Sequence, residues 1–557
     1  MAATEGKTHP WGLSPIAFDG TRTPLKTALF VTVCLAWLLP GLVGHDPWKT
    51  DEALAFGAVA EMLQTGDWLQ FRIAGEPLPG EAPLFLWTAA LFAKLLGGFI
   101  PLHDAARLAT GLYMAATLAL VSAAAWELMG ERAVRMSVLL LIGCLGLLIR
   151  AHEMTPELAA LAGIALALYG LALTPRRPWP AGVLTGLGIG VGYLGNGLLP
   201  VGMLATLLVI LPVASPAWRT RRYALVAVLA LACAAPFFLA WRPTIPPLGD
   251  FGQGSNRGVP YFLKLLTWYA WPAWPLAAWA VWRSRRNLAT RTELHLPIVA
   301  FAAFFAVIAV FGESRDVSAL PILLPLAILG VAELESLPRG GASALDWFGV
   351  MTFFLLAALL WLGWVAALTG KPDFAAAFLQ KEVPGFTYPF SFLAFSLASL
   401  LTLVWVVVVA RSLRSPRRAL VNWAAGITMV WMLVMTLGVP LVDQARSYRA
   451  VSARLVRALP PDFKCIARRN VGEAQRALLD YFANVRTIPA EFPAADRCAA
   501  LLVQAHPLRV PAVGPEWAET WRGARPGDRN ELFVVYRRIF LPSGITPPEP
   551  RPRLASG

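Results

Sequence analysis

Apolar runs of about twenty residues follow one another along most of the chain, separated by short polar breaks. A membrane interior about 30 Å thick requires roughly 20 apolar residues for each helical span. The first run has no small-residue cleavage site behind it, which favours a retained anchor over a removable signal peptide. The pattern predicts about thirteen membrane-spanning helices, near 25–43, 104–128, 133–150, 157–173, 179–195, 198–214, 223–241, 263–283, 295–311, 318–335, 346–369, 391–410 and 418–442.

The basic residues of the short breaks predict the orientation of these spans. By the positive-inside rule, such clusters mark the cytoplasmic face. They all fall on that face only if 84–100, which carries Lys94 and ends in two glycines, is an interfacial helix rather than a span. Residues 1–24 are then cytoplasmic, 25–442 form the membrane domain and 443–557 lie in the periplasm. The clusters comprise Arg132, Arg135, Arg176, Arg177, Arg219, Arg221, Arg222, Arg283, Arg285, Arg286, Arg411, Arg414, Arg417 and Arg418.

The composition excludes an ordinary soluble protein. Hydrophobic residues make up 57% of the 557 residues, charged residues make up 15%, and the mean hydropathy is +0.58. Soluble domains are typically about 45–50% apolar and about 25% charged. The net charge of +14 could indicate nucleic-acid binding. Because the basic residues lie beside spans, membrane topology explains them better, and no nucleic-acid partner is predicted.

The last hundred or so residues have the composition of a small soluble domain. Strand-like runs at 465–468, 499–504 and 532–537, with a helical pattern at 472–482, predict an α/β fold. The domain holds Cys465 and Cys498, whereas the other three cysteines lie within spans. An oxidising periplasm would allow these two cysteines to form a disulfide, and two free buried thiols are an equally open alternative.

The first outer loop, 44–103, is much longer than a simple connection between helices requires. Its first helical pattern begins near Thr50, a residue type that caps helices, and places Asp51 and Glu52 in the first turn. Acids at a helix start often serve only to complement the helix dipole. The length of the loop nevertheless favours a function for this segment.

The order of motifs in this loop is specific. Asp-Glu at 51–52 is followed by Glu-Met-Leu-Gln-Thr-Gly-Asp-Trp-Leu at 61–69, Gly-Glu-Pro at 75–77 and Glu-Ala-Pro at 81–83. This order resembles the lipid A aminoarabinose transferases, which are related to protein O-mannosyltransferases. The resemblance extends more weakly to Leu-Pro-Ile-Leu-Leu-Pro at 320–325. It implies a membrane glycosyltransferase fold of the GT-C type, all-α with periplasmic interfacial helices, in a bacterial inner membrane.

Such enzymes transfer a sugar from a polyprenyl-phosphate carrier to a lipid, glycan or protein acceptor at the periplasmic face. The resemblance implies that Asp51 acts as the base or orients the acceptor, with Glu52 as the adjacent acid. Glu157 matches a second acid of the family, at the end of the third span. A partly desolvated carboxylate at the membrane surface is suited to accept the proton of an acceptor hydroxyl.

Cationic or polar groups are expected to bind the donor phosphate, and the candidates are Arg315, Arg72, Arg257 and Asn196. Each also has a structural explanation: Arg315 has Glu313 and Asp316 beside it as salt-bridge partners, and Arg257 lies in a glycine-rich segment typical of a solvent loop. A divalent metal is a further possibility, with the candidate ligands Glu81, His152 and Glu153.

The chain departs from the family at two positions where aminoarabinose transferases have a lysine, which here are Ala82 and Asn196. The sugar and the acceptor therefore stay open, and a monomer is expected. A transporter or flippase is one alternative, although acids at span centres and symmetric halves, its usual signs, are not evident. A catalytically inactive relative is another.

Overall fold

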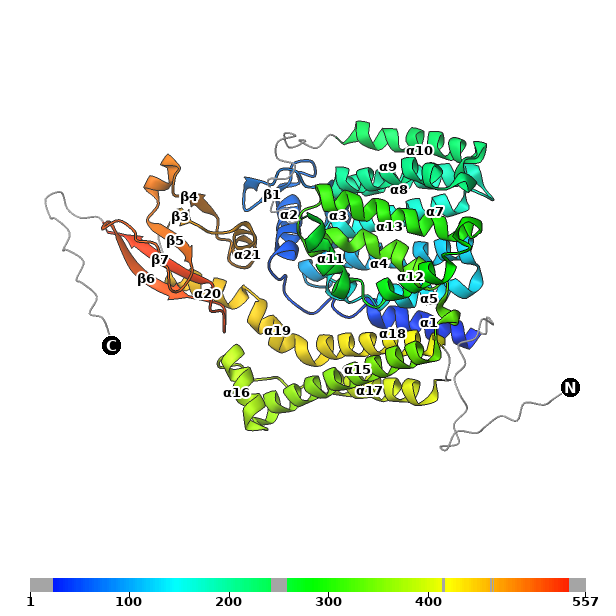
Figure 1. The fold of residues 1–557 in the computed structure, drawn as a ribbon. Coiled ribbons are helices and arrows are strands. Elements are labelled where there is room, and N and C mark those ends of the chain that lie inside the picture. Colours follow the sequence, from blue (N-terminus) through cyan, green and yellow to red (C-terminus); the bar gives the residue numbers. More distant parts are fainter. Residues whose placement is uncertain (1–23, 242–257, 413–415, 461–462, 464, 540–557) are drawn as a thin grey trace.

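The computed structural model is a helical bundle with a small sheet domain at one end (Figure 1). It describes residues 24–241, 258–412, 416–460, 463 and 465–539. The predicted fold class is confirmed: the chain is mostly helical and ends in a small domain with a sheet. Six helical segments of the described residues are long and apolar enough to cross a membrane. They are Leu102–Met129, Arg221–Ala240, Thr292–Phe311, Arg339–Thr369, Phe392–Arg411 and Arg417–Ala458. The count of thirteen spans stays a prediction, because several of the other predicted spans are shorter helices.

The first predicted span is helix α1 (Pro24–Leu38). The loop after it contains α2 (Asp51–Thr65), a short hairpin of β1 (Arg72–Ile73) and β2 (Glu76–Pro77), and α3 (Pro83–Leu96). With 14 residues, α3 is shorter than a straight span requires. This length agrees with an interfacial helix, while its position relative to a membrane stays a prediction.

The centre of the bundle is built from α4 (Leu102–Met129), α5 (Glu131–Ile142), α6 (Leu145–Arg150), α7 (Glu157–Leu173), α8 (Pro178–Asn196), α9 (Leu198–Ala214) and α10 (Arg221–Ala240). Helices α7 and α8 pack backbone to backbone. A Cβ atom on Gly163 would lie only 2.5 Å from the amide nitrogen of Gly192. Small residues allow such close packing in membrane proteins, where burial of apolar surface between helices contributes little.

Two predicted spans, 133–150 and 263–283, are each divided into two helices. The first is α5 and α6, and the second is α11 (Gly258–Tyr269) and α12 (Ala273–Ser284). The breaks lie side by side, because the Leu145 amide donates to the Trp271 carbonyl at 3.1 Å. In the break between α11 and α12, Pro272 has no N–H to continue the helix. In the break between α5 and α6, the Gly143 carbonyl accepts from the Trp423 indole at 2.8 Å. Side-chain and interhelical hydrogen bonds thus replace part of the helical pairing.

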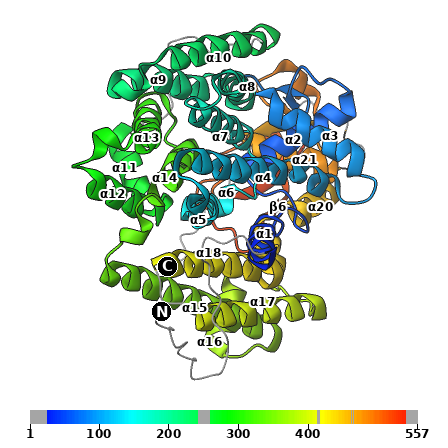
Figure 2. The ribbon, with the colours of Figure 1, turned by 90° about the vertical axis from the view of Figure 1, so that its right-hand side faces the viewer.

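Helix α13 (Thr292–Phe311), the short turn η4 (Asp316–Ala319) and α14 (Leu320–Gly330) complete the main bundle. A second layer contains α15 (Arg339–Thr369), α17 (Phe392–Arg411) and α18 (Pro416–Leu433), and both views show it beside the main bundle (Figures 1 and 2). The short helix α16 (Asp373–Glu382) joins α15 to α17. Helix α18 continues through a π-helical turn, Val434–Gly438, into α19 (Val439–Arg446).

The tail domain, defined here as residues 449–539, contains a five-stranded sheet in the order β4-β3-β5-β7-β6. Strand β3 pairs in parallel with β4 and β5, and β7 pairs antiparallel with β5 and β6. The structure joins Cys465 and Cys498 in a disulfide. The elements are α20 (Arg449–Ala458), β3 (Ile466–Arg469), α21 (Glu473–Ala483), β4 (Thr487–Pro489), β5 (Ala500–Ala505), β6 (Trp517–Gly523) and β7 (Leu532–Arg538).

The tail domain packs directly on the first outer loop. A Cβ atom on Gly57 of α2 would lie 2.6 Å from the Cβ atom of Ala477 on α21. Arg486 also donates to Glu61 at 3.0 Å, and Arg468 donates to Glu76 of the hairpin at 2.9 Å. These contacts fix α2 between the bundle and the tail domain, and its first turn lies at the candidate site.

Candidate active site

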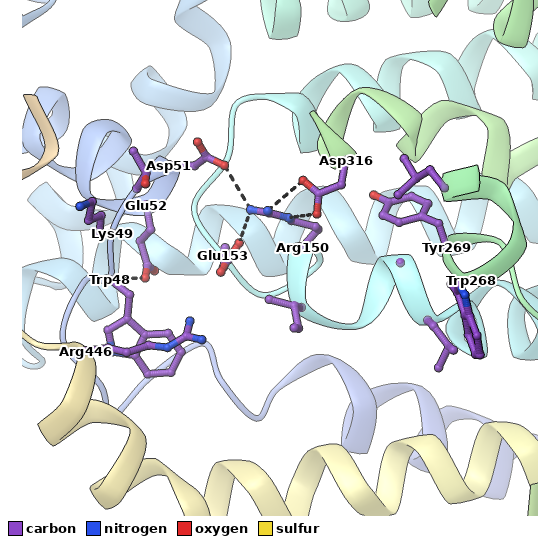
Figure 3. Close-up of a pocket in the computed structure, with 15 residues that line it drawn as sticks. Trp48, Lys49, Asp51, Glu52, Arg150, Glu153, Trp268, Tyr269, Asp316 and Arg446 are labelled. Atoms are coloured by element: carbon purple, nitrogen blue, oxygen red, sulfur yellow. Dashed lines mark hydrogen bonds and ion pairs between the residues drawn. The ribbon is translucent and has the colours of Figure 1, made fainter. Parts of the chain in front are cut away.

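The first turn of α2 places its two acids in different surroundings (Figure 3). Thr50 occupies the N-cap position, but its side chain makes no capping hydrogen bond, contrary to the prediction. Instead, the Glu52 carboxylate turns back and accepts from the Trp48 amide at 2.9 Å. Asp51 points the other way, toward an arginine from the end of α6 (Figure 3).

That arginine, Arg150, is surrounded by three carboxylates. It donates to both carboxylate oxygens of Asp316 at 3.1 and 2.9 Å, to Asp51 at 3.1 Å and to Glu153 at 2.8 Å. Such bidentate, charge-assisted pairs fix a guanidinium in one orientation. Arg150 therefore ties together three segments that are distant in sequence: α2, the α6–α7 connection and η4.

A second arginine, Arg315, contacts the other oxygen of Asp51. Its guanidinium donates to Asp51 Oδ1 at 2.7 Å and lies 3.9 Å from Glu157 and 3.5 Å from Glu313. The side chain is 44% exposed, whereas that of Arg150 is 23% exposed. Three of the predicted residues, Asp51, Glu157 and Arg315, are thus brought together by the fold.

Asp51, Arg150 and Asp316 border a cavity of about 550 Å³. Arg315 and Glu157 are not among its lining residues, and Arg315 reaches the cavity only through its contact with Asp51. Its wall is partly aromatic: Tyr269 enters it from the break between α11 and α12, next to Gly146. A Cβ atom on Gly146 would lie 2.2 Å from the Tyr269 ring, so a larger residue would displace the ring. The lining residues are Trp48, Lys49, Thr50, Asp51, Glu52, Leu145, Gly146, Ile149, Arg150, Glu153, Leu265, Trp268, Tyr269, Asp316 and Arg446.

Arg446, at the end of α19, is the cation of this cavity with the fewest internal partners. Its guanidinium lies over the Trp48 ring, 5.4 Å from the ring centroid (Figure 3). None of the carboxylates that the structure describes forms an ion pair with it. Lys49, by contrast, is bonded to Glu531 of the tail domain at 3.2 Å. Arg446 therefore faces the cavity as a positive charge that is not neutralised by a described acid.

Two other acids near the cavity have raised pKa values. Burial raises the pKa of the Glu81 carboxyl to about 7, and the nearby charge of Glu157 adds to the increase. Burial likewise raises the pKa of Glu153 to about 7, although Arg150 opposes the shift. Desolvation disfavours the charged form of a carboxylate. Both groups therefore titrate close to neutral pH, which suits proton transfer.

Glu52 belongs to a separate, buried ion cluster. Its carboxylate is 2% exposed and accepts from Arg107 at 2.6 Å, and Arg107 also donates to Asp104 at 2.7 Å. Arg107 is fully buried and reaches the backbone carbonyls of Leu42 and His45 as well. Glu52 was predicted to be catalytic, and that role stays a prediction: the carboxylate borders the cavity, and its charge is paired with the buried Arg107. Its place in the structure is that of an anchor for the start of α2.

Two predicted phosphate-binding residues that the structure describes, Arg72 and Asn196, do not line the cavity. Arg72 lies on β1 and donates to Gln70 at 2.9 Å. Asn196 ends α8, which packs close to the first turns of α7, but it does not line the cavity. Arg257 lies outside the described residues.

The predicted metal site is not formed among the described residues, where no three histidine, cysteine, aspartate or glutamate side chains are grouped to hold an ion. His152 shows the reason. Its two ring nitrogens are engaged by the carbonyls of Leu148 and Trp37, each at 2.7 Å, and its side chain is buried against Trp37. Because a carbonyl oxygen faces each ring nitrogen, neither nitrogen is open to a metal ion. Glu153 pairs with Arg150 instead.

Sequence reasoning missed Arg150, Asp316 and Arg446 as site residues. Arg150 and Asp316 each lie next to a predicted residue or motif, yet their pairing across the fold has no signal in sequence spacing. Arg446 follows the last predicted span, on the periplasmic face, where the positive-inside rule does not predict basic residues. A charge at that position on the predicted outer face was the one available hint.

Comparisons with known proteins agree with this architecture. A sequence model of the dolichyl-phosphate-mannose-protein mannosyltransferase family matches residues 80–241. The crystal structure of ArnT from Cupriavidus metallidurans bound to undecaprenyl phosphate superimposes with a TM-score of 0.67 and 18% sequence identity, over 92% of this chain and 98% of that chain. The chain has the fold of ArnT.

The apo structure of ArnT from the same organism gives a TM-score of 0.64 at 18% identity, over 91% of this chain and 97% of that chain. A comparison with curated protein sequences found no match. At this identity the ArnT likeness establishes the fold, including the end of the bundle where the tail domain packs. The chemistry of the cavity has to be argued from the residues of this chain.

Proposed function

We propose that this protein is a membrane glycosyltransferase that moves a sugar from a polyprenyl-phosphate carrier to an acceptor hydroxyl or phosphate oxygen. The ArnT fold and the mannosyltransferase match support the reaction class. The observation that carries the proposal is the position of Asp51, which lines a cavity together with Arg150 and whose other oxygen accepts from Arg315. A carboxylate and cations at one cavity suit a reaction in which a proton is accepted and a phosphate leaves.

The phosphate of the donor binds Arg315 and Arg446. Arg315 is half-exposed and can exchange its contact with Asp51 for a contact with phosphate. Arg446 is not neutralised by a described acid, and its position on the cavity wall compensates for the lysines that the sequence lacks. Arg150 is already fixed by three carboxylates, so it orients Asp51 rather than binding the donor.

When phosphate takes over Arg315, the Asp51 carboxylate becomes available to the acceptor. It then accepts the acceptor proton while the acceptor oxygen bonds to the sugar, and the sugar–oxygen bond to the carrier breaks with its electron pair on the phosphate. Glu157 keeps the arginine in place on its other side. Because the acceptor is unassigned, a lipid, a glycan and a protein hydroxyl all fit this scheme.

The proposed setting is a bacterial inner membrane, with the cavity and the tail domain on the periplasmic face. The basic clusters at the other polar breaks support this orientation. The disulfide between Cys465 and Cys498 supports an oxidising compartment for the tail domain.

The test is reconstitution of the full-length protein in liposomes with a radiolabelled polyprenyl-phosphate sugar and a membrane lipid extract as acceptor. The wild type is expected to move label to the acceptor and to release polyprenyl phosphate. Asp51→Asn is expected to lower the rate by about 10²–10⁴-fold, the usual contribution of a general base. Asp373→Asn changes an exposed acid in the first turn of α16 and serves as the matched control. Equal rates for wild type and Asp51→Asn would refute the proposed role.

A further inference from the structure

A second large cavity lies at the end of the bundle opposite the tail domain. It has a volume of about 660 Å³ and lies where the ends of α4 and α7 meet the starts of α10 and α13. The proposed transfer reaction makes no use of it. Its lining residues are Glu127, Leu128, Ala172, Thr174, Pro175, Arg176, Ala217, Trp218, Thr220, Arg221, Arg222, Thr292 and Glu293.

Both acids of this cavity are already paired. Glu127 accepts from Arg176 at 2.8 Å, and Glu293 accepts from Arg291 at 2.8 Å. Their negative charge is therefore compensated within the protein and opposes an incoming anion only weakly.

The two remaining arginines are available to a ligand. Arg222 donates one N–H group to the Pro175 carbonyl, and both residues line the cavity. The side chain of Arg221 forms no ion pair or hydrogen bond with any residue that the structure describes, and both arginine side chains are exposed. Two exposed guanidinium groups on one cavity can together hydrogen-bond the oxygens of a phosphate group.

A buried hydroxyl supports the same ligand chemistry. Thr174 is only 3% exposed, and its Oγ1 atom has no hydrogen-bond partner among the described residues. A buried hydroxyl without a partner costs free energy, and a phosphate oxygen or its bridging water would satisfy it. Thr174 lies in the same cavity wall as Arg222.

The surface beside the cavity is apolar. On α9, Val209 and Val213 are each 68% exposed, and Val213 is four residues before Ala217 of the cavity wall. On α10, Val228 and Leu231 are 64% and 66% exposed. This surface suits acyl chains, which a free phosphate ion does not have.

We infer that this cavity binds the phosphate headgroup of an anionic membrane phospholipid, through Arg221, Arg222 and the Thr174 hydroxyl, with the acyl chains against α9 and α10. Basic pockets between helices at the cytoplasmic side of membrane proteins bind such headgroups. The site is independent of the proposed glycosyl transfer.

The test is native mass spectrometry of the full-length protein in detergent, titrated with phosphatidylglycerol, cardiolipin or zwitterionic phosphatidylcholine. The two anionic lipids are expected to bind more tightly than phosphatidylcholine. Each arginine near the membrane surface contributes about 5-fold to such binding, so Arg221→Ala should weaken it about 5-fold and the double variant R221A/R222A about 25-fold. Equal affinity for the three lipids would overturn the inference.

The controls separate this site from general positive charge. Arg285→Ala removes an exposed arginine that stacks on Trp282 outside the cavity, and it should leave lipid binding unchanged. Arg221→Lys should retain most of the lipid affinity. If Arg285→Ala weakened lipid binding as much as Arg221→Ala does, the proposed site would be contradicted. Displacement of phosphatidylglycerol by millimolar inorganic phosphate would show a small-anion site and refute the lipid assignment. Arg221→Ala keeps the test usable if the double variant does not fold, because the side chain of Arg221 bonds to no described residue.

Discussion

Two arginine clusters lie on either side of the first turn of α2, and they differ mainly in their access to water. Around Arg107, Glu52 and Asp104 form a cluster whose central guanidinium is fully buried. Around Arg150, Asp51 belongs to a cluster that opens onto a cavity and reaches the half-exposed Arg315. Adjacent acids of one motif therefore have different tasks. We propose that Glu52 fixes the start of the helix, whereas Asp51 is presented to a substrate.

The largest expected effect concerns the buried cluster. Arg107→Ala leaves Glu52 and Asp104 without their shared cation, and breaking a buried ion pair typically costs about 3–5 kcal/mol. We expect a marked fall in the apparent Tm of the purified protein and poor yield from membranes. The matched variant Arg176→Ala removes an exposed arginine from a surface pair and should change Tm little. If Arg107→Ala had the Tm of the wild type, the cluster around Arg107 would not be more important for stability than the cluster around Arg150.

A smaller effect is expected for Arg446, an arginine that lines the cavity, and it should appear in activity rather than in stability. Charge-assisted hydrogen bonds contribute about 1.5–3 kcal/mol, so Arg446→Ala should lower kcat/KM for the polyprenyl-phosphate donor about 10–100-fold. Tm should remain close to that of the wild type, since Arg446 has no carboxylate partner among the described residues.

Arg457→Ala, which removes an exposed arginine at the end of α20, is the control for this change. Arg446→Lys keeps the charge and should restore part of the activity. If Arg446→Ala lowered Tm and left kcat/KM unchanged, Arg446 would have a structural role like that of Arg107 and would not bind the donor.

The smallest expected effect is a change in the pH dependence of stability. The pKa of Glu81 is about 7 in the folded protein, against 4.5 for an ordinary glutamate. Between these values the folded state binds more protons than the unfolded state, so the contribution of Glu81 to stability is fully present below about pH 4.5 and is lost as the pH rises through 7. Glu81→Gln should reduce this fall. Apparent Tm measured from pH 5 to pH 8 tests it, and parallel profiles for both proteins would contradict the raised pKa.

Hydrophobic patterning predicted most helices of the bundle, because each span must satisfy its own backbone in lipid. The tail domain was predicted at the level of three strands and one helix. The runs 133–150 and 263–283 were predicted as single helices. The composition of each run is apolar throughout, and the hydrogen bond from Leu145 to Trp271 that joins the two breaks is visible only in three dimensions.

At the candidate site, family resemblance predicted Asp51, Glu157 and Arg315, and the fold brings them together. It did not distinguish Asp51 from Glu52, because the sequence does not show which acid meets a buried arginine. Arg107 lies fifty-five positions after Glu52, within a predicted span. The sequence also did not show that the ring nitrogens of His152 face two backbone carbonyls, because backbone groups are present at every position. His152 was therefore predicted as a metal ligand.

The most direct test compares Asp51→Asn with Glu52→Gln, two changes of similar size in adjacent residues. For both variants, transfer of labelled sugar in liposomes and apparent Tm in detergent are measured on the same preparations. The two variants are predicted to differ in opposite ways. Asp51→Asn should lose sugar transfer and keep nearly the wild-type Tm. Glu52→Gln should have a lower Tm, while its folded fraction retains sugar transfer. Loss of transfer in folded Glu52→Gln, with Asp51→Asn active, would contradict the assignment of the two acids.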